Sequence, residues 1–148
     1  MFKRKLSPND LLTSKLYDQD TFYDRFLSDL KACRHEAFNK SPFITNRRLN
    51  QLMPTLEKLK AQHVRLAVNT KDPEHHDDEY FHSDARQAIS RLQHMVIQVL
   101  FTASHHRKLT IIDRQILYEG SLNILSQNDS CEIMRRMRSM PLKRCSDI

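Results

Sequence analysis

Apolar residues recur every three or four positions in three stretches of the chain, which is the spacing that places them along one face of an α-helix. The stretches are residues 21–37, 47–62 and 83–93. Their apolar faces comprise Phe22, Phe26, Leu30 and Cys33 in the first, Leu49, Leu52, Leu56 and Leu59 in the second, and Ala85, Ile89 and Leu92 in the third. Ser83 can cap the third helix with its hydroxyl. The pattern therefore predicts three amphipathic helices.

Shorter runs of β-branched and apolar residues alternate with these helices and predict strands. The runs are residues 41–45, 64–69, 95–101, 107–113, 115–119 and 131–137. The turn-like segment Asp113-Arg114-Gln115 joins the fourth and fifth runs into a hairpin. The alternation predicts one α/β domain, residues 1–148, with a mixed central β-sheet flanked by helices on both faces. Residues 1–18 and 139–148 lie outside the pattern as an N-terminal extension and a basic tail.

Gly120 is the only glycine in the chain, whereas a soluble domain carries about 7% glycine. It ends the second strand of the predicted hairpin, where a residue without a Cβ lets the backbone turn sharply or approach a ligand closely. Ser121 and Asn123 follow it. On the first strand, the alternation of side chains puts His106 and Lys108 on one face. An imidazole, an ammonium group, a hydroxyl and a carboxamide together can bind and attack a phosphate.

The specified positions of this segment read H-x-K-x4-D-x6-G-S-x-N from His106 onward, and they resemble the signature motif of the phospholipase D superfamily. Every specified position is filled at the expected spacing. Ser41-Pro42-Phe43-Ile44 before a helix and the strand at Val64–Val68 are also similar to bacterial members, so the resemblance covers about residues 20–138. It implies the phospholipase D-like fold and a phosphodiesterase that requires neither a metal nor another cofactor.

The resemblance also implies a role for each matching residue. In this family two motifs meet in one active site, where one histidine attacks the phosphodiester and the other protonates the leaving oxygen. His106 would be the nucleophile or the acid, Lys108 and Asn123 would bind phosphate oxygens, and Ser121 would support the same pocket. Asp113 and Gly120 would be structural. The acid that orients the histidine would be Glu132, with Asp129 as the alternative.

The chain carries one copy of the motif, since no other histidine has a lysine two residues on. Short members of the family with a single motif form homodimers, and the resemblance implies the same here. The alternative is that the chain is a fragment of a longer protein.

The net charge of the chain indicates which kind of partner it binds. The net charge of +6 and the isoelectric point of about 9.4 favour a polyanion. Arg135 and Arg136 follow the motif and Arg107 lies within it, so these three can contact phosphates of a nucleic acid, DNA rather than RNA. A solvated surface is the alternative interpretation, and it stays open at this point.

Several function classes fit less well. No run approaches the roughly 18 apolar residues of a membrane span, and the N-terminus does not resemble a signal peptide. Three cysteines without metal-ligand spacing fit a reducing compartment. We therefore expect a cytoplasmic protein with no membrane partner. The segment 74–79 with His82 contains many metal-ligand side chains, but its spacing matches no recognised metal site and it follows Asp72-Pro73, where a polar loop is expected.

The sequence thus predicts a metal-independent endonuclease of the phospholipase D type. One alternative is a non-catalytic or accessory DNA-binding module of a larger helicase-associated system. A true phospholipase is the remaining alternative, although nothing in the sequence suits a bilayer.

Overall fold

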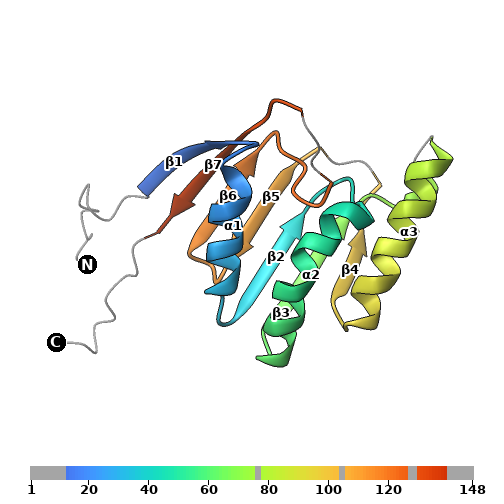
Figure 1. Ribbon diagram of the computed structural model, residues 1–148, viewed down its shortest axis with the longest axis horizontal. Coiled ribbons are helices and arrows are strands. Elements are labelled where there is room, and N and C mark those ends of the chain that lie inside the picture. The colour runs from blue at the N-terminus through green and yellow to red at the C-terminus, as the bar shows by residue number, and fades with distance from the viewer. Residues whose placement is uncertain (1–12, 76–77, 104–105, 127–129, 140–148) are drawn as a thin grey trace, which may run out of the picture.

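The computed structural model describes residues 13–75, 78–103, 106–126 and 130–139. Within these residues the helices are α1 (Phe22–Lys31), α2 (Asn46–Ala61) and α3 (Glu79–His94), and a short 3-10 turn covers Pro73–His75. The strands are β1 (Thr13–Asp18), β2 (Glu36–Lys40), β3 (Arg65–Thr70), β4 (Gln98–Phe101), β5 (Lys108–Ile112), β6 (Ile116–Gly120) and β7 (Ile133–Arg138). They form one sheet in the order β1-β7-β6-β5-β2-β3-β4 (Figure 1).

The sheet is mixed, as the sequence predicts. The three strands β2, β3 and β4 are parallel, and every other neighbouring pair is antiparallel. This α/β architecture confirms the predicted fold class. The hairpin predicted around Asp113 is also present, since β5 and β6 pair in register from Lys108 with Gly120 to Ile112 with Ile116.

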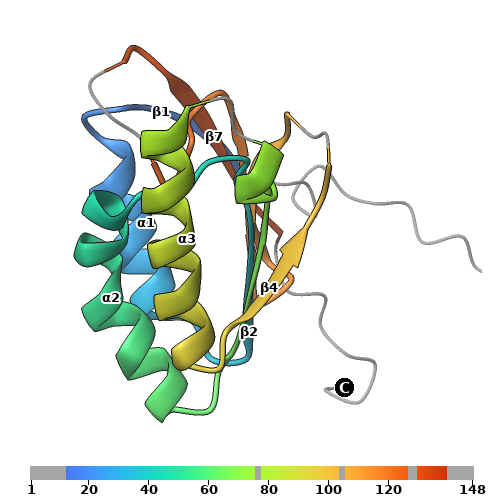
Figure 2. The same cartoon turned by 90° about the vertical axis from the view of Figure 1, so that its right-hand side faces the viewer.

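The predicted position of the helices needs a correction, because α1, α2 and α3 all cover the same face of the sheet (Figure 2). Sheet residues on that face are buried, including Leu66, Ile112 and Tyr118, whereas Ile111 on the other face is exposed. The strand order explains this arrangement. The connections from β2 to β3 and from β3 to β4 step in the same direction across the sheet. Right-handed crossovers in one direction place their helices on one face of the sheet. Helices cover both faces only where the direction of the strand order reverses.

The prediction of a strand at residues 41–45 was wrong, because β2 lies five residues earlier, at Glu36–Lys40. The sequence expectation followed the apolar residues of the later segment. In the structure, β2 places Ala37 and Asn39 on the buried face. Asn39 is polar, and hydrogen bonds to its side chain make its burial possible. Helix α1 consequently ends at Lys31, well before the expected residue 37.

The N-terminal region and the third helix also differ from expectation. Residues 13–18, expected to belong to an extension, form β1 and pair with β7 along its whole length. The side chains of β1 are mostly exposed, so no apolar alternation marked the strand. Helix α3 starts at Glu79, where the side chain of Asp78 accepts a hydrogen bond from the Tyr80 N–H, and Ser83 lies inside the helix. The predicted basic tail, apart from Ser139, lies outside the described residues.

One edge of the sheet brings together most of the residues singled out in the motif. At this edge, called the carboxyl edge below, β2, β3, β4 and β6 end and β5 and β7 begin, and all three helices start there (Figure 1). Helix N-termini carry partial positive charge, so their shared position favours anions at this edge.

Candidate active site

His106 and Lys108 lie at the beginning of β5, on the carboxyl edge. Lys108 is the first residue of the strand and pairs with Gly120, the last residue of β6. Alternation puts Lys108 on the same face as the buried Thr110. Its ammonium donates a hydrogen bond of 3.4 Å to the backbone oxygen of His106, whose side chain is exposed. The ammonium group of Lys108 therefore lies against the backbone of His106, and the side chain of His106 is open to a ligand.

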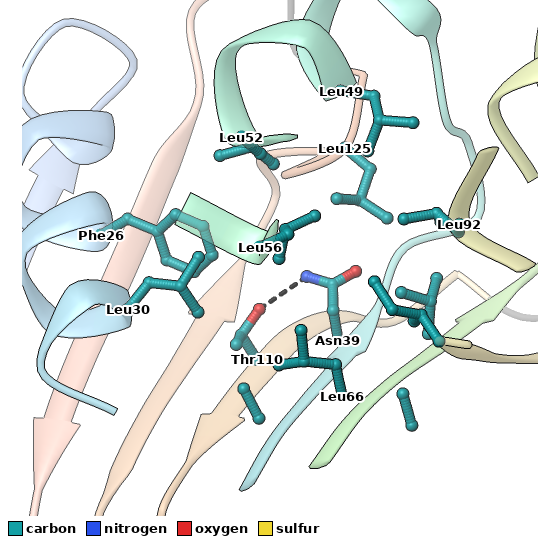
Figure 3. Close-up of a pocket in the computed structure, with 14 residues that line it drawn as sticks. Phe26, Leu30, Asn39, Leu49, Leu52, Leu56, Leu66, Leu92, Thr110 and Leu125 are labelled. Atoms are coloured by element: carbon teal, nitrogen blue, oxygen red, sulfur yellow. Dashed lines mark hydrogen bonds between the residues drawn. The ribbon is translucent and has the colours of Figure 1, made fainter. Parts of the chain in front are cut away.

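A buried polar network lies next to Lys108. The side-chain amide of Asn39 donates a 2.6 Å hydrogen bond to the Thr110 hydroxyl, and the Ser41 hydroxyl donates one of 2.8 Å to the side-chain oxygen Oδ1 of Asn39. Continuing the register of β2 with β5 by one residue places Ser41 opposite Lys108. Figure 3 shows the Asn39–Thr110 bond among the apolar side chains that line a pocket. The volume of this cavity is about 40 Å³. Such a satisfied network fixes the strands that carry the site.

This network was not predicted from the sequence. Asn39 and Thr110 occupy inward strand positions where apolar residues are the rule, and a polar residue at such a position is a signal that could have indicated it.

Asn123 lies in the loop after β6, which is anchored to two helices. Leu125 of this loop accepts a 3.0 Å hydrogen bond from the Thr45 N–H at the start of α2, and the Tyr23 hydroxyl of α1 donates one of 2.6 Å to the Ile124 oxygen. The side-chain oxygen of Asn123 is buried and has no hydrogen-bond partner among the described residues. A buried acceptor without a hydrogen-bond partner lowers the stability of a fold. The presence of the Asn123 carboxamide at this position is therefore not explained by a contribution to stability.

Gly120 is required by the neighbouring strand. A Cβ at this position would lie 2.2 Å from the Ile133 oxygen and 2.9 Å from the Met134 Cα, both in β7. The Ser121 hydroxyl then extends the pairing, because its oxygen accepts a 3.0 Å hydrogen bond from the Ile133 N–H. The close approach anticipated from the sequence is thus between β6 and β7, and it holds the loop with Asn123 against the sheet edge.

Gly120→Ala is expected to destabilise the protein by about 3 kcal/mol, because two strands must separate to admit a methyl group. Urea unfolding measures the difference. Glu119→Ala, one residue earlier on β6 and exposed, is the matched control and should change the free energy of unfolding by less than about 0.5 kcal/mol. Equal effects of the two substitutions would contradict the steric explanation.

Asp113 lies at the opposite end of the hairpin from His106. Its carboxylate accepts backbone hydrogen bonds of 2.9 Å from Arg34, 2.8 Å from His35 and 3.0 Å from Glu36, where the chain leads from α1 into β2. Burial alone would raise the pKa of Asp113, but these hydrogen bonds outweigh it and lower the pKa. Burial, together with the charge of Asp113, raises the pKa of Cys33 to about 12. Asp113 therefore ties the hairpin to β2.

Asp113→Asn is expected to cost about 2 kcal/mol at pH 7, because the amide group replaces an acceptor with a donor that faces a backbone N–H. The folded-state pKa of Asp113 is lowered, so its contribution is present above the unfolded-state pKa and is lost as the pH falls through the folded-state value. Urea unfolding at several pH values should show the difference from wild type shrinking below about pH 4. The exposed substitution Glu57→Gln should show no such convergence, and a pH-independent difference for Asp113→Asn would contradict the prediction.

The prediction that Arg136 contacts nucleic acid was wrong. Its side chain is buried under α1, and its guanidinium donates hydrogen bonds of 2.7 and 3.0 Å to the two carboxylate oxygens of Asp29. The Tyr118 hydroxyl donates a short hydrogen bond to the same carboxylate. Burial alone would raise the pKa of Asp29, but Arg136 and Tyr118 lower it, and burial beside Asp29 raises the pKa of Tyr118. Little surface remains on Arg136 for a phosphate.

The other two arginines are exposed. Arg107 directly follows His106 on the carboxyl edge, whereas Arg135 lies on the face of β7 opposite the buried Arg136. Arg107 is therefore positioned beside the candidate site, and Arg135 faces the side of the sheet without helices.

Glu132 lies just before β7 and is half-buried. Its carboxylate accepts a 3.4 Å hydrogen bond from the Ser130 hydroxyl, and its backbone N–H donates one of 3.1 Å to the Gln19 side chain. Among the contacts of the described residues, none joins Glu132 to His106. Asp129, the alternative, lies outside the described residues, so the acid that orients His106 stays a prediction.

Among the described residues, no group of three or more histidine, cysteine, aspartate or glutamate side chains is arranged to hold a metal ion. In the acidic segment before α3, Glu74 binds Arg86 and lies 3.2 Å from His82; His76 and Asp77 are not described. No helix in the described part of the chain is both long and apolar enough to cross a membrane.

No protein-family model matches the chain, and no curated protein matches it. Solved structures do. Nuc from Salmonella typhimurium, a phospholipase D family member, has 14% sequence identity and a TM-score of 0.69, covering 88% of this chain and 85% of Nuc. NucT from Helicobacter pylori has 14% identity and a TM-score of 0.66 over 86% of each chain.

These likenesses show that the chain has the phospholipase D fold. Polyphosphate kinase from Porphyromonas gingivalis has 12% identity and a TM-score of 0.63, covering 86% of this chain but 23% of the kinase. Because proteins with different names share this fold, the substrate has to be argued from the site itself.

Proposed function

We propose that the chain is a metal-independent phosphodiesterase that cleaves nucleic acid, as an endonuclease, with an active site completed by a second copy of the chain. The observation that carries this proposal is the position of His106 and Lys108 at the start of β5, with Lys108 paired to Gly120 just before Ser121 and Asn123. Imidazole, ammonium and carboxamide thus share one edge with three helix N-termini. Together they suit a phosphate that is attacked by a histidine.

In the proposed first step, an imidazole nitrogen of His106 attacks the phosphorus of the phosphodiester. A P–N bond forms, the bond to one ester oxygen breaks, and that oxygen takes a proton from the imidazolium of the second copy. In the next step, water attacks the phosphohistidine, gives a proton to the now neutral second imidazole, and breaks the P–N bond. The products are an alcohol and a phosphate monoester. Lys108 neutralises the charge on the non-bridging oxygens, and Asn123 binds one of them.

The homodimer follows from this chemistry. One motif supplies one imidazole of this kind, whereas the reaction uses two in different protonation states. A two-fold axis at the carboxyl edge would bring the two His106 side chains to one phosphate. The exposure of His106 is compatible with such a contact.

Charge supports nucleic acid as the substrate. The net charge of +6 favours a polyanion, and Arg107 adds a cation beside His106. DNA is the expected form, and the cysteine content supports action in the cytoplasm.

Incubating the protein with plasmid DNA in excess EDTA tests the proposal, with RNA and phosphatidylcholine vesicles as competing substrates. We expect DNA cleavage that the chelator does not abolish and no release of lipid head groups. Cleavage that disappears with EDTA, or hydrolysis confined to the lipid, would contradict it. Binding of DNA without any turnover would favour the accessory-module alternative.

A further inference from the structure

The exposed aromatic side chains of the described residues all lie at the carboxyl edge. They are Phe43, Tyr80, Phe81 and Phe101, with exposed fractions of 38%, 74%, 42% and 49%. Phe43 lies between β2 and α2, Tyr80 and Phe81 form the first turn of α3, and Phe101 ends β4. The other large apolar residues that are exposed are aliphatic, namely Leu16, Val96, Leu100, Ile111 and Ile133. We call the four aromatic residues the aromatic rim.

Hydrogen bonds connect this rim to the candidate active site. The Thr45 N–H at the start of α2 binds the Leu125 oxygen, two residues beyond Asn123. The next residue, Asn46, donates a 2.9 Å hydrogen bond to the Asp84 carboxylate, one helical turn after Tyr80. The rim and the site therefore belong to one continuous edge (Figure 1).

The other end of the rim is fixed in a similar way. The Thr70 hydroxyl donates a 3.3 Å hydrogen bond to the Pro42 oxygen, next to Phe43, and the Thr70 oxygen accepts one of 3.1 Å from the Thr102 N–H, next to Phe101. The aromatic side chains are thus exposed on a backbone that is held in place.

The rim has charges of both signs nearby, whereas the candidate site is flanked by cations. The cations Arg107 and Lys108 flank the candidate site, whereas Glu74, Asp78 and Glu79 lie near the start of α3 and Lys71 lies beside Phe43. Asp78 caps α3 and Glu74 binds Arg86, so these carboxylates also have structural partners. A polyanion would place its phosphates at the cationic end, and uncharged aromatic groups suit the other end. Nucleic acid bases are such groups.

We propose that the aromatic rim stacks the bases of a single-stranded polynucleotide whose scissile phosphate lies at His106 and Lys108. This inference rests on the proposed function and names its substrate class. In a duplex the faces of the bases are covered by their neighbours, whereas in a single strand they are available to aromatic side chains. The rings of Tyr80 and Phe81 lie 5.8 Å apart at an interplanar angle of 78°, so they present faces in two directions. Single strands are therefore the preferred substrate.

The test compares wild type with Tyr80→Ala/Phe81→Ala on three substrates: a single-stranded oligonucleotide, an abasic strand of the same length, and a duplex. The double variant should raise the KM for the single strand by roughly tenfold or more, with kcat unchanged. The KM for the abasic strand should not change. Tyr80→Phe/Phe81→Tyr keeps two rings and should restore the wild-type KM, and Val96→Ala, which removes exposed apolar surface elsewhere, should have no effect.

Preference of the wild type for duplex would overturn the inference, and so would an equal loss on the abasic strand. The second outcome, combined with a changed sedimentation coefficient, would identify the rim as a subunit interface. Fluorescence anisotropy of the labelled oligonucleotide keeps the inference separate from the proposed function. If no substrate is cleaved, weaker binding by the double variant alone still supports the rim, and equal binding by all variants overturns it.

Discussion

His106→Ala is expected to lower the rate of DNA cleavage by about 10⁴-fold or more, because it removes both the nucleophile and, in a homodimer, the acid that protonates the leaving oxygen. The residual rate should reflect binding of the phosphate by Lys108 and Asn123. Lys108→Ala should cost less, roughly 10²- to 10³-fold, since it removes charge stabilisation but leaves the covalent route open. Cleavage rates measured in EDTA with saturating substrate give both values.

His35→Ala is the matched control for this experiment. His35 is also exposed, but it lies in the segment before β2, at the end of the sheet opposite His106. Its replacement should leave the rate within about twofold of wild type, since surface substitutions of this kind have small effects. A His106→Ala protein that folds normally and retains a tenth or more of the wild-type rate would contradict the assigned role.

Arg136→Met is expected to destabilise the fold by about 3 kcal/mol, because it leaves the buried Asp29 carboxylate with only the more exposed guanidinium of Arg25, 3.5 Å away, as a counterion. The guanidinium makes two hydrogen bonds to this carboxylate in the space between α1 and the sheet. Arg135→Met, one residue earlier on β7, is the matched control. Its side chain is exposed, so the free energy of unfolding should change by less than about 1 kcal/mol.

The double variant Asp29→Leu/Arg136→Met separates an unpaired charge from a loss of packing. Removing both charges should recover much of the stability lost in Arg136→Met. The pH dependence has a defined direction. The folded-state pKa of Asp29 is lowered, so its stabilising effect is present above the unfolded-state pKa and is lost as the pH falls through the folded-state value. Equal stabilities of the Arg136→Met and Arg135→Met proteins would contradict the assignment of a buried pair.

Local patterns in the sequence predicted much of the fold. The apolar spacing of Phe22, Phe26 and Leu30 predicted the buried face of α1, and the run around Asp113 predicted the hairpin of β5 and β6. Both signals depend on residues close together in the sequence. The position of β2 could not be predicted in this way, because its inward Asn39 is stabilised by Thr110 from another strand.

The same limit applies to the candidate site. The motif predicted that His106 and Lys108 would share a face with Gly120 nearby, and the pairing of Lys108 with Gly120 agrees with that geometry. Arg136 was assigned to a nucleic-acid contact because it follows the motif in a chain with a net charge of +6. Its burial depends on Asp29, which lies 107 positions away, and charge counts along a sequence do not include such a partner.

Capture of the covalent intermediate would show directly whether His106 is the nucleophile. An internally labelled single-stranded oligonucleotide is mixed with excess protein in EDTA, quenched in alkali at short times and analysed by peptide mass spectrometry. We expect a nucleotide attached through phosphorus to the peptide that contains His106, formed and lost at rates consistent with product release, and absent from His106→Ala. Accumulation of product with no adduct on His106 at any time, or an adduct on another residue, would contradict it.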